Sequence, residues 1–341
     1  MSRIRSWFKS FLADVYFGIF PSQLEKKMST LSVFSISDDD TKLKFWLKVT
    51  GPEKVVNRLL EESGNGYATD CHQAAHQIGR VAFSLLGQRA FGRGDASCHS
   101  GYYHGAMEEF LKTNGTRELA SKITALCNDF ETYFETFECL HGVGHGVMAY
   151  EAYNIPKALD QCGSLYDDFA RSSCYGGVFM ENIAAGKGAG AIAGHETEWV
   201  NHEDPHFPCN AVGDDYNIRF QCYQMQTSWM LHLNEYDFDK TAEWCEEADK
   251  DMVSVCFKSL GRDVAGYTLR QPQKIVELCD VVPRNQDYYN QCITGAANVI
   301  IDFWGPKLTD QADGLCALLD EDNKSVCYSL VNARKQEMVK M

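Results

Sequence analysis

The stretch from Cys139 to Tyr150 reads CLHGVGHGVMAY, and it contains the two features around which the rest of the chain is organised. Its first residue belongs to a series of cysteines that recurs down the sequence. Its histidines, His141 and His145, are four residues apart, so a helix places both imidazoles on one face, one turn apart. The stretch therefore predicts a helix that connects a cysteine-based architecture to a histidine-based site.

The fourteen cysteines of this 341-residue chain follow a regular rhythm. From position 127 onward they form six couples whose members are 11 to 13 residues apart, and the second members recur at steps near 35 residues, with one longer step of 48. The first cysteine of a couple ends a segment with helical periodicity, and the second follows an acidic stretch suited to capping a new helix. A period near 35 residues is typical of helical hairpins. We therefore expect an all-α, right-handed αα-hairpin repeat solenoid with a TPR or Sel1-like plan.

Each couple is expected to form a disulfide across its hairpin, because antiparallel helices can bring two Cα atoms within the roughly 4.4–6.8 Å that a disulfide needs. No Cys-x-x-Cys knuckle occurs, so a zinc site built from cysteines is disfavoured. Buried free thiols are also disfavoured, because they would not be expected to occur in regularly spaced couples. Cys71 and Cys98 fall outside the rhythm, and either pair with each other or stay reduced near the histidines. Disulfides imply an oxidising compartment, so we expect a secreted, periplasmic or lumenal protein.

The chain divides into three parts. Residues 1–28 form a basic and apolar lead segment that has the start of a secretory signal but no small-residue cleavage site, so it is a possible signal, a membrane-associating helix or an ordinary first helix. Residues 29–69 are expected to form a helical lead-in. Residues 70–341 are expected to form the disulfide-stapled repeat domain, with an insertion loop at 186–208.

Composition limits the classes of partner. Acidic residues outnumber basic residues by 47 to 32, giving a net charge of −15, and no long Lys/Arg cluster is present to follow a phosphate backbone. Nucleic-acid binding is therefore disfavoured. No apolar run reaches the roughly 20 residues that cross a bilayer. Peripheral membrane association through residues 1–20 is the membrane contact that the sequence suggests.

The histidines are concentrated in the first units of the array. Six of the ten lie between positions 72 and 145, and His72–His76 repeats the i, i+4 spacing of His141–His145. At 100° per residue from each second cysteine, the sixth residues lie on one polar stripe of the inner helices. These residues are His104, His145, Met180, Ser228, Arg262 and Asn298. The third residue after the cysteine is glycine in most units, including Gly177 and Gly295, which suits close helix packing.

Side chains at i, i+4 on one helix can chelate one metal ion. The predicted ligands are His72, His76, His104, His141 and His145. Glu108 and Glu181 are candidate catalytic carboxylates that move protons, and Glu181 is also a candidate partner that orients a histidine. Imidazole and carboxylate ligands favour zinc or iron as the metal. The alternative is that the histidines line a groove or satisfy buried hydrogen bonds, which suits single histidines better than the whole set.

The predicted function is a metal-dependent enzyme, either a hydrolase or a non-haem iron oxygenase, that acts on a small-molecule or peptide substrate. A zincin protease is not supported, because Gln73 and Gly142 occupy the places where the HExxH motif has glutamate. The alternative function is a protein- or peptide-binding helical-repeat scaffold without catalysis. A polar site concentrated at one end of the stripe favours chemistry there, with substrate contacts further along the stripe.

Overall fold

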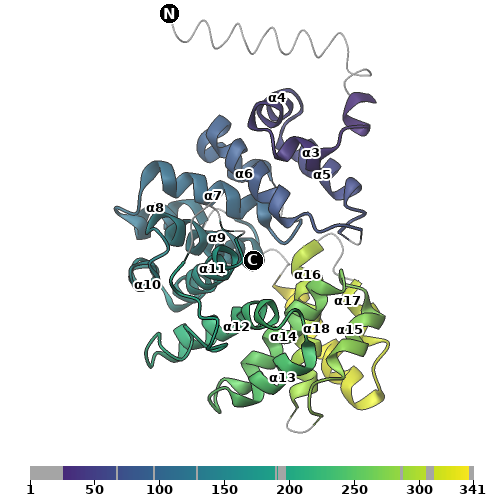
Figure 1. The fold of residues 1–341 in the computed structure, drawn as a ribbon. Helices are drawn as coiled ribbons and strands as arrows, with labels where there is room; N and C mark the ends of the chain where they lie inside the picture. The colour runs from purple at the N-terminus through teal and green to yellow at the C-terminus, as the bar shows by residue number, and fades with distance from the viewer. Residues whose placement is uncertain are drawn as a thin grey trace, which may run out of the picture.

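The computed structural model describes residues 26–66, 68–94, 97–127, 130–188, 190, 197–284, 287–304 and 311–337. Helix makes up 73% of the structure and the described residues contain no strand, which confirms the all-α prediction. The α-helices and one 3-10 helix follow one another along the chain (Figure 1). They are α3 (Val33–Ser37), α4 (Asp40–Thr50), α5 (Pro52–Glu62), α6 (His72–Leu86), η1 (Gly87–Arg93), α7 (Gly101–Asn114), α8 (Leu119–Cys127), α9 (Tyr133–Tyr150), α10 (Ile155–Gly163), α11 (Asp168–Gly186), α12 (Tyr216–Leu233), α13 (Phe238–Glu247), α14 (Val253–Tyr267), α15 (Pro272–Cys279), α16 (Tyr288–Trp304), α17 (Gln311–Cys316) and α18 (Glu321–Gln336).

Five helical hairpins are each stapled by a disulfide. In each of them a short helix packs on the long helix that follows it, in the pairs α8–α9, α10–α11, α13–α14, α15–α16 and α17–α18. The first cysteine lies at or near the end of the short helix and the second lies in the first turns of the long helix, with Cα atoms 5.3 to 6.0 Å apart. This is the placement that the cysteine spacing predicts.

The Cys209–Cys222 pair departs from that pattern. Cys222 lies in α12 as expected, but Cys209 lies in a turn, because the preceding stretch from 197 to 210 forms no helix. Pro205 and Pro208 both interrupt this stretch, and proline cannot donate the backbone hydrogen bond that a helix interior requires. The insertion therefore replaces one short helix while keeping the disulfide.

All fourteen cysteines are paired. Cys71 and Cys98, which precede α6 and α7, form the seventh disulfide, with Cα atoms 5.5 Å apart. Seven disulfides indicate an oxidising, extracytoplasmic environment. Within the described residues no helix combines the length and the apolarity needed to cross a bilayer. The predicted signal or membrane-associating segment at 1–20 lies outside the described residues.

The long helices form the inner layer, in which each helix packs on the next. Glycines permit the closest approaches. A Cβ built on Gly144 of α9 would lie 2.0 Å from the carbonyl oxygen of Cys174, and one built on Gly177 of α11 would lie 1.9 Å from that of His141. Equivalent reciprocal pairs hold α6 against α7 and α14 against α16, namely Gly79 with Gly105 and Gly261 with Gly295. The close packing predicted at Gly177 and Gly295 is therefore confirmed.

Replacing Gly177 by alanine is expected to lower the free energy of unfolding by about 1–3 kcal/mol, because the new methyl group forces α9 and α11 apart. The matched control is Gly266→Ala in α14, where no atom lies within 4 Å of the added Cβ. There alanine should stabilise the helix by up to about 1 kcal/mol. Urea unfolding measures both changes, and equal stabilisation by the two substitutions would contradict close contact at Gly177.

The last units of the array contact the first ones. The backbone N–H of His99, just before α7, donates to Phe303 O of α16 at 3.2 Å, and that of Phe134 in α9 donates to Glu337 O at 3.0 Å. Figure 1 shows the helices of the array following a curved course. The array therefore curves until its last units contact its first ones, while the 35-residue period and the hand of the repeats stay predictions.

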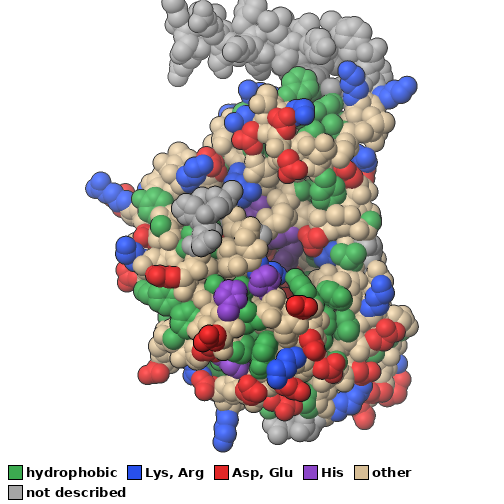
Figure 2. All heavy atoms as spheres, viewed as in Figure 1, with side chains coloured by type: hydrophobic (Ala, Val, Ile, Leu, Met, Phe, Trp, Pro, Cys, Tyr) green, Lys and Arg blue, Asp and Glu red, His purple; other side chains and the backbone are tan. Residues whose placement is uncertain are grey.

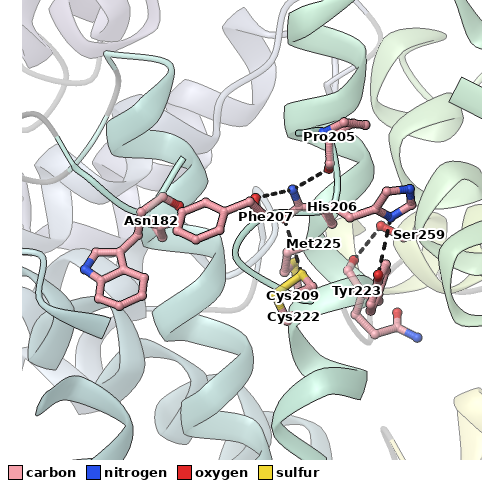
Figure 3. Close-up of a disulfide and its surroundings, with 12 residues drawn as sticks. Asn182, Pro205, His206, Phe207, Cys209, Cys222, Tyr223, Met225 and Ser259 are labelled. Carbon is pink, nitrogen blue, oxygen red and sulfur yellow. Dashed lines mark hydrogen bonds between the residues drawn. A yellow bond between two sulfur atoms is a disulfide. The ribbon is translucent and has the colours of Figure 1, made fainter. Parts of the chain in front are cut away.

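The predicted insertion loop at 186–208 lies partly within the described residues, and that part is tied to the inner helices. Asn182 Nδ2 of α11 donates to Trp199 O at 2.8 Å. Gln226 Nε2 of α12 donates to Pro205 O and Phe207 O, each at 2.8 Å. Figure 3 shows the contacts of α12 with this segment beside the disulfide that follows it. The described part is thus packed against α11 and α12.

Candidate metal centre

Four consecutive inner helices bring the predicted site residues together. Helix α6 carries His72 and His76, α7 carries His104 and Glu108, α9 carries His141 and His145, and α11 carries Glu181. Every one of them except His72 is buried, with the four buried histidines between 1% and 4% exposed. Figure 2 shows histidine side chains gathered near the middle of one face, some of them recessed in a hollow. The i, i+4 pairs thus converge from neighbouring helices.

The side chains form two adjacent groups. One ligand atom from each of His72, His76 and His104 lies within 4.8 Å of the others, and Glu108, His145 and Glu181 form the second group on the same criterion. The ring centroids of the three histidines are 4.5, 5.3 and 5.6 Å apart. In a tetrahedral zinc site with Zn–N near 2.1 Å, neighbouring imidazole centroids lie roughly 5 Å apart. The three histidines are therefore spaced as ligands of one metal ion.

One nitrogen of each of four imidazoles is held by a hydrogen bond. The partners are His72 Nδ1 with Cys98 O at 2.8 Å, His76 Nδ1 with Glu108 Oε1 at 2.8 Å, His104 Nε2 with Glu138 Oε2 at 3.0 Å, and His145 Nδ1 with Glu181 Oε2 at 3.0 Å. A carboxylate or carbonyl oxygen that accepts from one ring nitrogen orients the ring and leaves the lone pair on the other. This is the usual environment of a metal-binding histidine.

The opposite nitrogens lack such partners. His104 Nδ1 and His145 Nε2 are buried without a hydrogen-bond partner among the described residues. His72 Nε2 and His76 Nε2 face each other at 3.1 Å, although the other nitrogen of each ring is the one that donates. Two lone pairs at this distance repel each other unless a proton or a cation lies between them. The arrangement therefore calls for a shared positive charge.

Burial keeps these imidazoles neutral. It lowers the pKa of His72 to about 4, with the neighbouring His76 adding to the effect. Burial also lowers the pKa of His76, and lowers that of His104 well below its usual value. A neutral imidazole is the form that binds metal, and protonation is disfavoured here, so a metal ion is the cation that fits.

In the metal-free protein we expect the free energy of unfolding to fall as the pH drops from 6.5 to about 4. The unfolded chain binds protons on its histidines near pH 6.5, whereas folded His72 binds one only near pH 4, so acid favours the unfolded chain. His72 alone contributes on the order of 3 kcal/mol to this loss. Chemical unfolding of chelator-treated protein between pH 7 and 4 measures it. A His72→Gln variant with the same pH dependence would contradict the assignment.

Three residues that support the histidines were not identified from the sequence. Arg80 NH1 donates to Glu108 Oε2 at 2.5 Å, and Tyr153 OH donates to Glu181 Oε1 at 2.9 Å. Glu138 Oε2 lies 3.0 Å from His104 Nε2, and burial, with Asp302 nearby, raises the pKa of Glu138 to about 8. Glu138 directly precedes Cys139, so a count that began at the cysteine missed it. The spacing of the cysteines and histidines does not indicate Arg80 or Tyr153, so their contacts could not be predicted from it.

His141 and His99 lie beside the centre. His141 belongs to neither group, although its ring centroid is 5.2 Å from those of His104 and His145 and both of its ring nitrogens are buried without a partner among the described residues. His99 has its ring centroid 5.5 Å from that of His72. Both line a central cavity together with His104.

The assignments of individual ligands and catalytic residues stay predictions, while a His/Glu group within metal-binding distance is present. No protein-family model, curated protein or solved structure matches this chain, so its function has to be inferred from the site itself.

Proposed function

We propose that this protein is a zinc-dependent hydrolase whose metal is held by His72, His76 and His104. The observation that carries the proposal is the convergence of these three imidazoles within 4.8 Å, each with its opposite nitrogen hydrogen-bonded. Three protein ligands leave a fourth position open, which is the arrangement of catalytic zinc sites, whereas structural sites have four.

The second group supplies a base beside the open position. His145 has its ring 4.9 Å from that of His104, and its Nε2 is buried without a partner among the described residues. Glu181 holds the other nitrogen of His145, in the way that a carboxylate orients a catalytic base. A bound zinc ion would supply an acidified water as the nucleophile, and His145 would be the base that accepts a proton there. Glu108 and Glu181 then position imidazoles instead of transferring protons themselves.

Zinc suits this site better than iron. Non-haem iron oxygenases typically use two histidines and one carboxylate as ligands. Here the carboxylates of Glu108 and Glu181 accept hydrogen bonds from imidazole N–H groups, and Glu108 also pairs with Arg80. The groups available to bind the metal are therefore neutral imidazoles. Zinc has no electronic preference for one coordination geometry, so it can bind in the arrangement that these imidazoles provide.

An enzyme fits the described architecture better than a peptide-binding scaffold. The curved array holds one partly open cavity of about 220 Å³ beside the histidines, whereas an extended peptide needs a groove that runs along the array. We therefore propose a small-molecule substrate. The seven disulfides support a secreted or periplasmic location, and the five stapled hairpins support repeats of one unit near 35 residues.

The test combines metal analysis with hydrolysis of p-nitrophenyl acetate by protein purified without chelators. We expect one zinc per chain, and hydrolysis that is lost on chelation and restored by zinc. His145→Gln should retain zinc but lose hydrolysis, because it removes the base and keeps the ligands. Absence of stoichiometric metal after reconstitution would refute the proposal. Two zinc ions per chain, or loss of zinc in His145→Gln, would make His145 a ligand and overturn its role as base.

A further inference from the structure

The centre of the curved array contains a partly open cavity of about 220 Å³ beside the histidines. Its walls come from the inner helices α9, α11, α12, α14, α16 and α18, together with His99 and His104. Four members of the predicted polar stripe line it, namely His104, Met180, Arg262 and Asn298. Because the array curves, stripe residues on successive helices line the same cavity.

Unpaired hydrogen-bonding groups are concentrated in this lining. Among the buried side-chain nitrogen atoms without a partner in the described residues, five belong to residues that line the cavity. They are both ring nitrogens of His141, Gln224 Nε2, Arg262 Nε, and His104 Nδ1, which the proposed metal would take. Buried polar groups are normally satisfied, so a cluster of exceptions indicates a ligand. Arg262 Nε and Gln224 Nε2 are donors, and a ligand that satisfies them must therefore carry acceptors.

The charges in the lining favour an anion. Asp302 accepts from Arg334, and burial raises the pKa of Glu138 to about 8, so neither carboxyl group adds an unpaired negative charge to the lining at pH 7. Lys258 Nζ makes no hydrogen bond or ion pair with the described residues, although the carboxylates of Asp302 and Glu337 are close enough to act on it electrostatically.

Arg262 binds Ser228 at 2.7 Å and Asp263 at 3.0 Å through its terminal nitrogen, which leaves Nε unpaired. Lys258 and Arg262 are four residues apart on α14, so they project from the same side of that helix.

We propose that the central cavity binds a small monocarboxylate with an apolar body, and that Lys258 and Arg262 hold its carboxylate. Gln224 of α12 and His141 of α9 are the further donors available to it. Phe137, Phe220 and Val299 provide the apolar wall. The volume lies below the roughly 300–1,000 Å³ of pockets for drug-sized ligands, so a ligand of about the size of benzoate fits it.

A carboxylate in this place has a chemical relation to the zinc centre, because His104 belongs to both. Adding water to an ester or amide releases a carboxylic acid, so the ligand is of the class that such a hydrolase produces. Its role as product rests on the proposed function. Its binding does not, because Lys258 and Arg262 lie on α14 and bind no metal in the proposed site.

Calorimetric titration with benzoate, benzamide and benzamidine tests the site with probes of similar shape and different charge. Both the zinc-loaded and the chelated protein should bind benzoate, with benzamide weaker by about 10- to 100-fold and benzamidine not bound. Lys258→Met should weaken benzoate binding by a similar factor and leave benzamide binding unchanged. Lys250→Met, at an exposed position on the loop before α14, is the control and should change neither.

Equal affinity for benzoate and benzamide would overturn the proposal, as would unchanged benzoate binding in a folded Lys258→Met variant. Benzoate binding to the zinc-loaded protein alone would place the carboxylate on the metal, which also overturns it. Binding to neither form, with zinc present at one ion per chain, would refute the carboxylate site and leave the metal centre standing.

Discussion

His104→Ala is expected to weaken zinc binding by at least about 100-fold, the largest effect of any single substitution at the site. Loss of an outer partner of a metal ligand typically costs 10- to 100-fold in affinity, and removal of a ligand costs more. His104 is one of the three grouped histidines, and its buried, unpaired Nδ1 is the nitrogen that it offers to the proposed ion. Competition with a chromophoric chelator measures the change in affinity.

His232→Ala provides the control for that experiment, because His232 lies on the exposed end of α12 and outside both groups. Its zinc affinity should equal that of the unmodified protein. Far-ultraviolet circular dichroism establishes that the His104→Ala chain keeps its helices. If that chain is folded and binds one zinc with unchanged affinity, the three-histidine centre is wrong, whatever the activity of the protein.

Full reduction of the disulfides is expected to unfold the chain at 25 °C. Closing a loop of 11 to 13 residues contributes about 3 kcal/mol on the chain-entropy model, and six disulfides close loops of this length. Their sum exceeds the roughly 5–15 kcal/mol by which a typical domain is stable. Loss of helical circular dichroism in a phosphine reductant, followed together with thiol titration, measures the effect.

Before reduction the denatured protein should titrate no thiols, because all fourteen cysteines are paired. A single staple can be removed by replacing Cys162 and Cys174 together with serine, which should lower the free energy of unfolding by about 3 kcal/mol and keep the fold. A chain with fourteen titratable thiols and undiminished helix content would contradict the staple role. In that case the packing of the inner helices alone would account for stability.

The hairpins could be predicted because their determinants are local. Cys127 and Cys139 are twelve residues apart, and a disulfide across that distance requires the chain to turn back on itself between two helical segments. The histidine pairs are equally local, since His72 and His76 share a helical face wherever the helix lies. The sequence was therefore sufficient to predict the all-α class and the disulfide-stapled hairpins. It was also sufficient to predict that His72, His76 and His104 lie on adjacent helices.

The tertiary structure decided what depends on residues far apart in the chain. His141 has the same spacing from His145 as His72 has from His76, yet it lies outside both groups of possible ligands and lines the cavity. Lys258 meets the histidine end of the array only because the contacts at Phe303 and Glu337 close the array. The two ends meet because each helix is rotated slightly relative to the one before it, and these rotations add up along the array. Each rotation depends on how side chains pack at that interface. Residue periodicity determines which face of a helix is inward, but the curvature of the whole array follows from packing between helices.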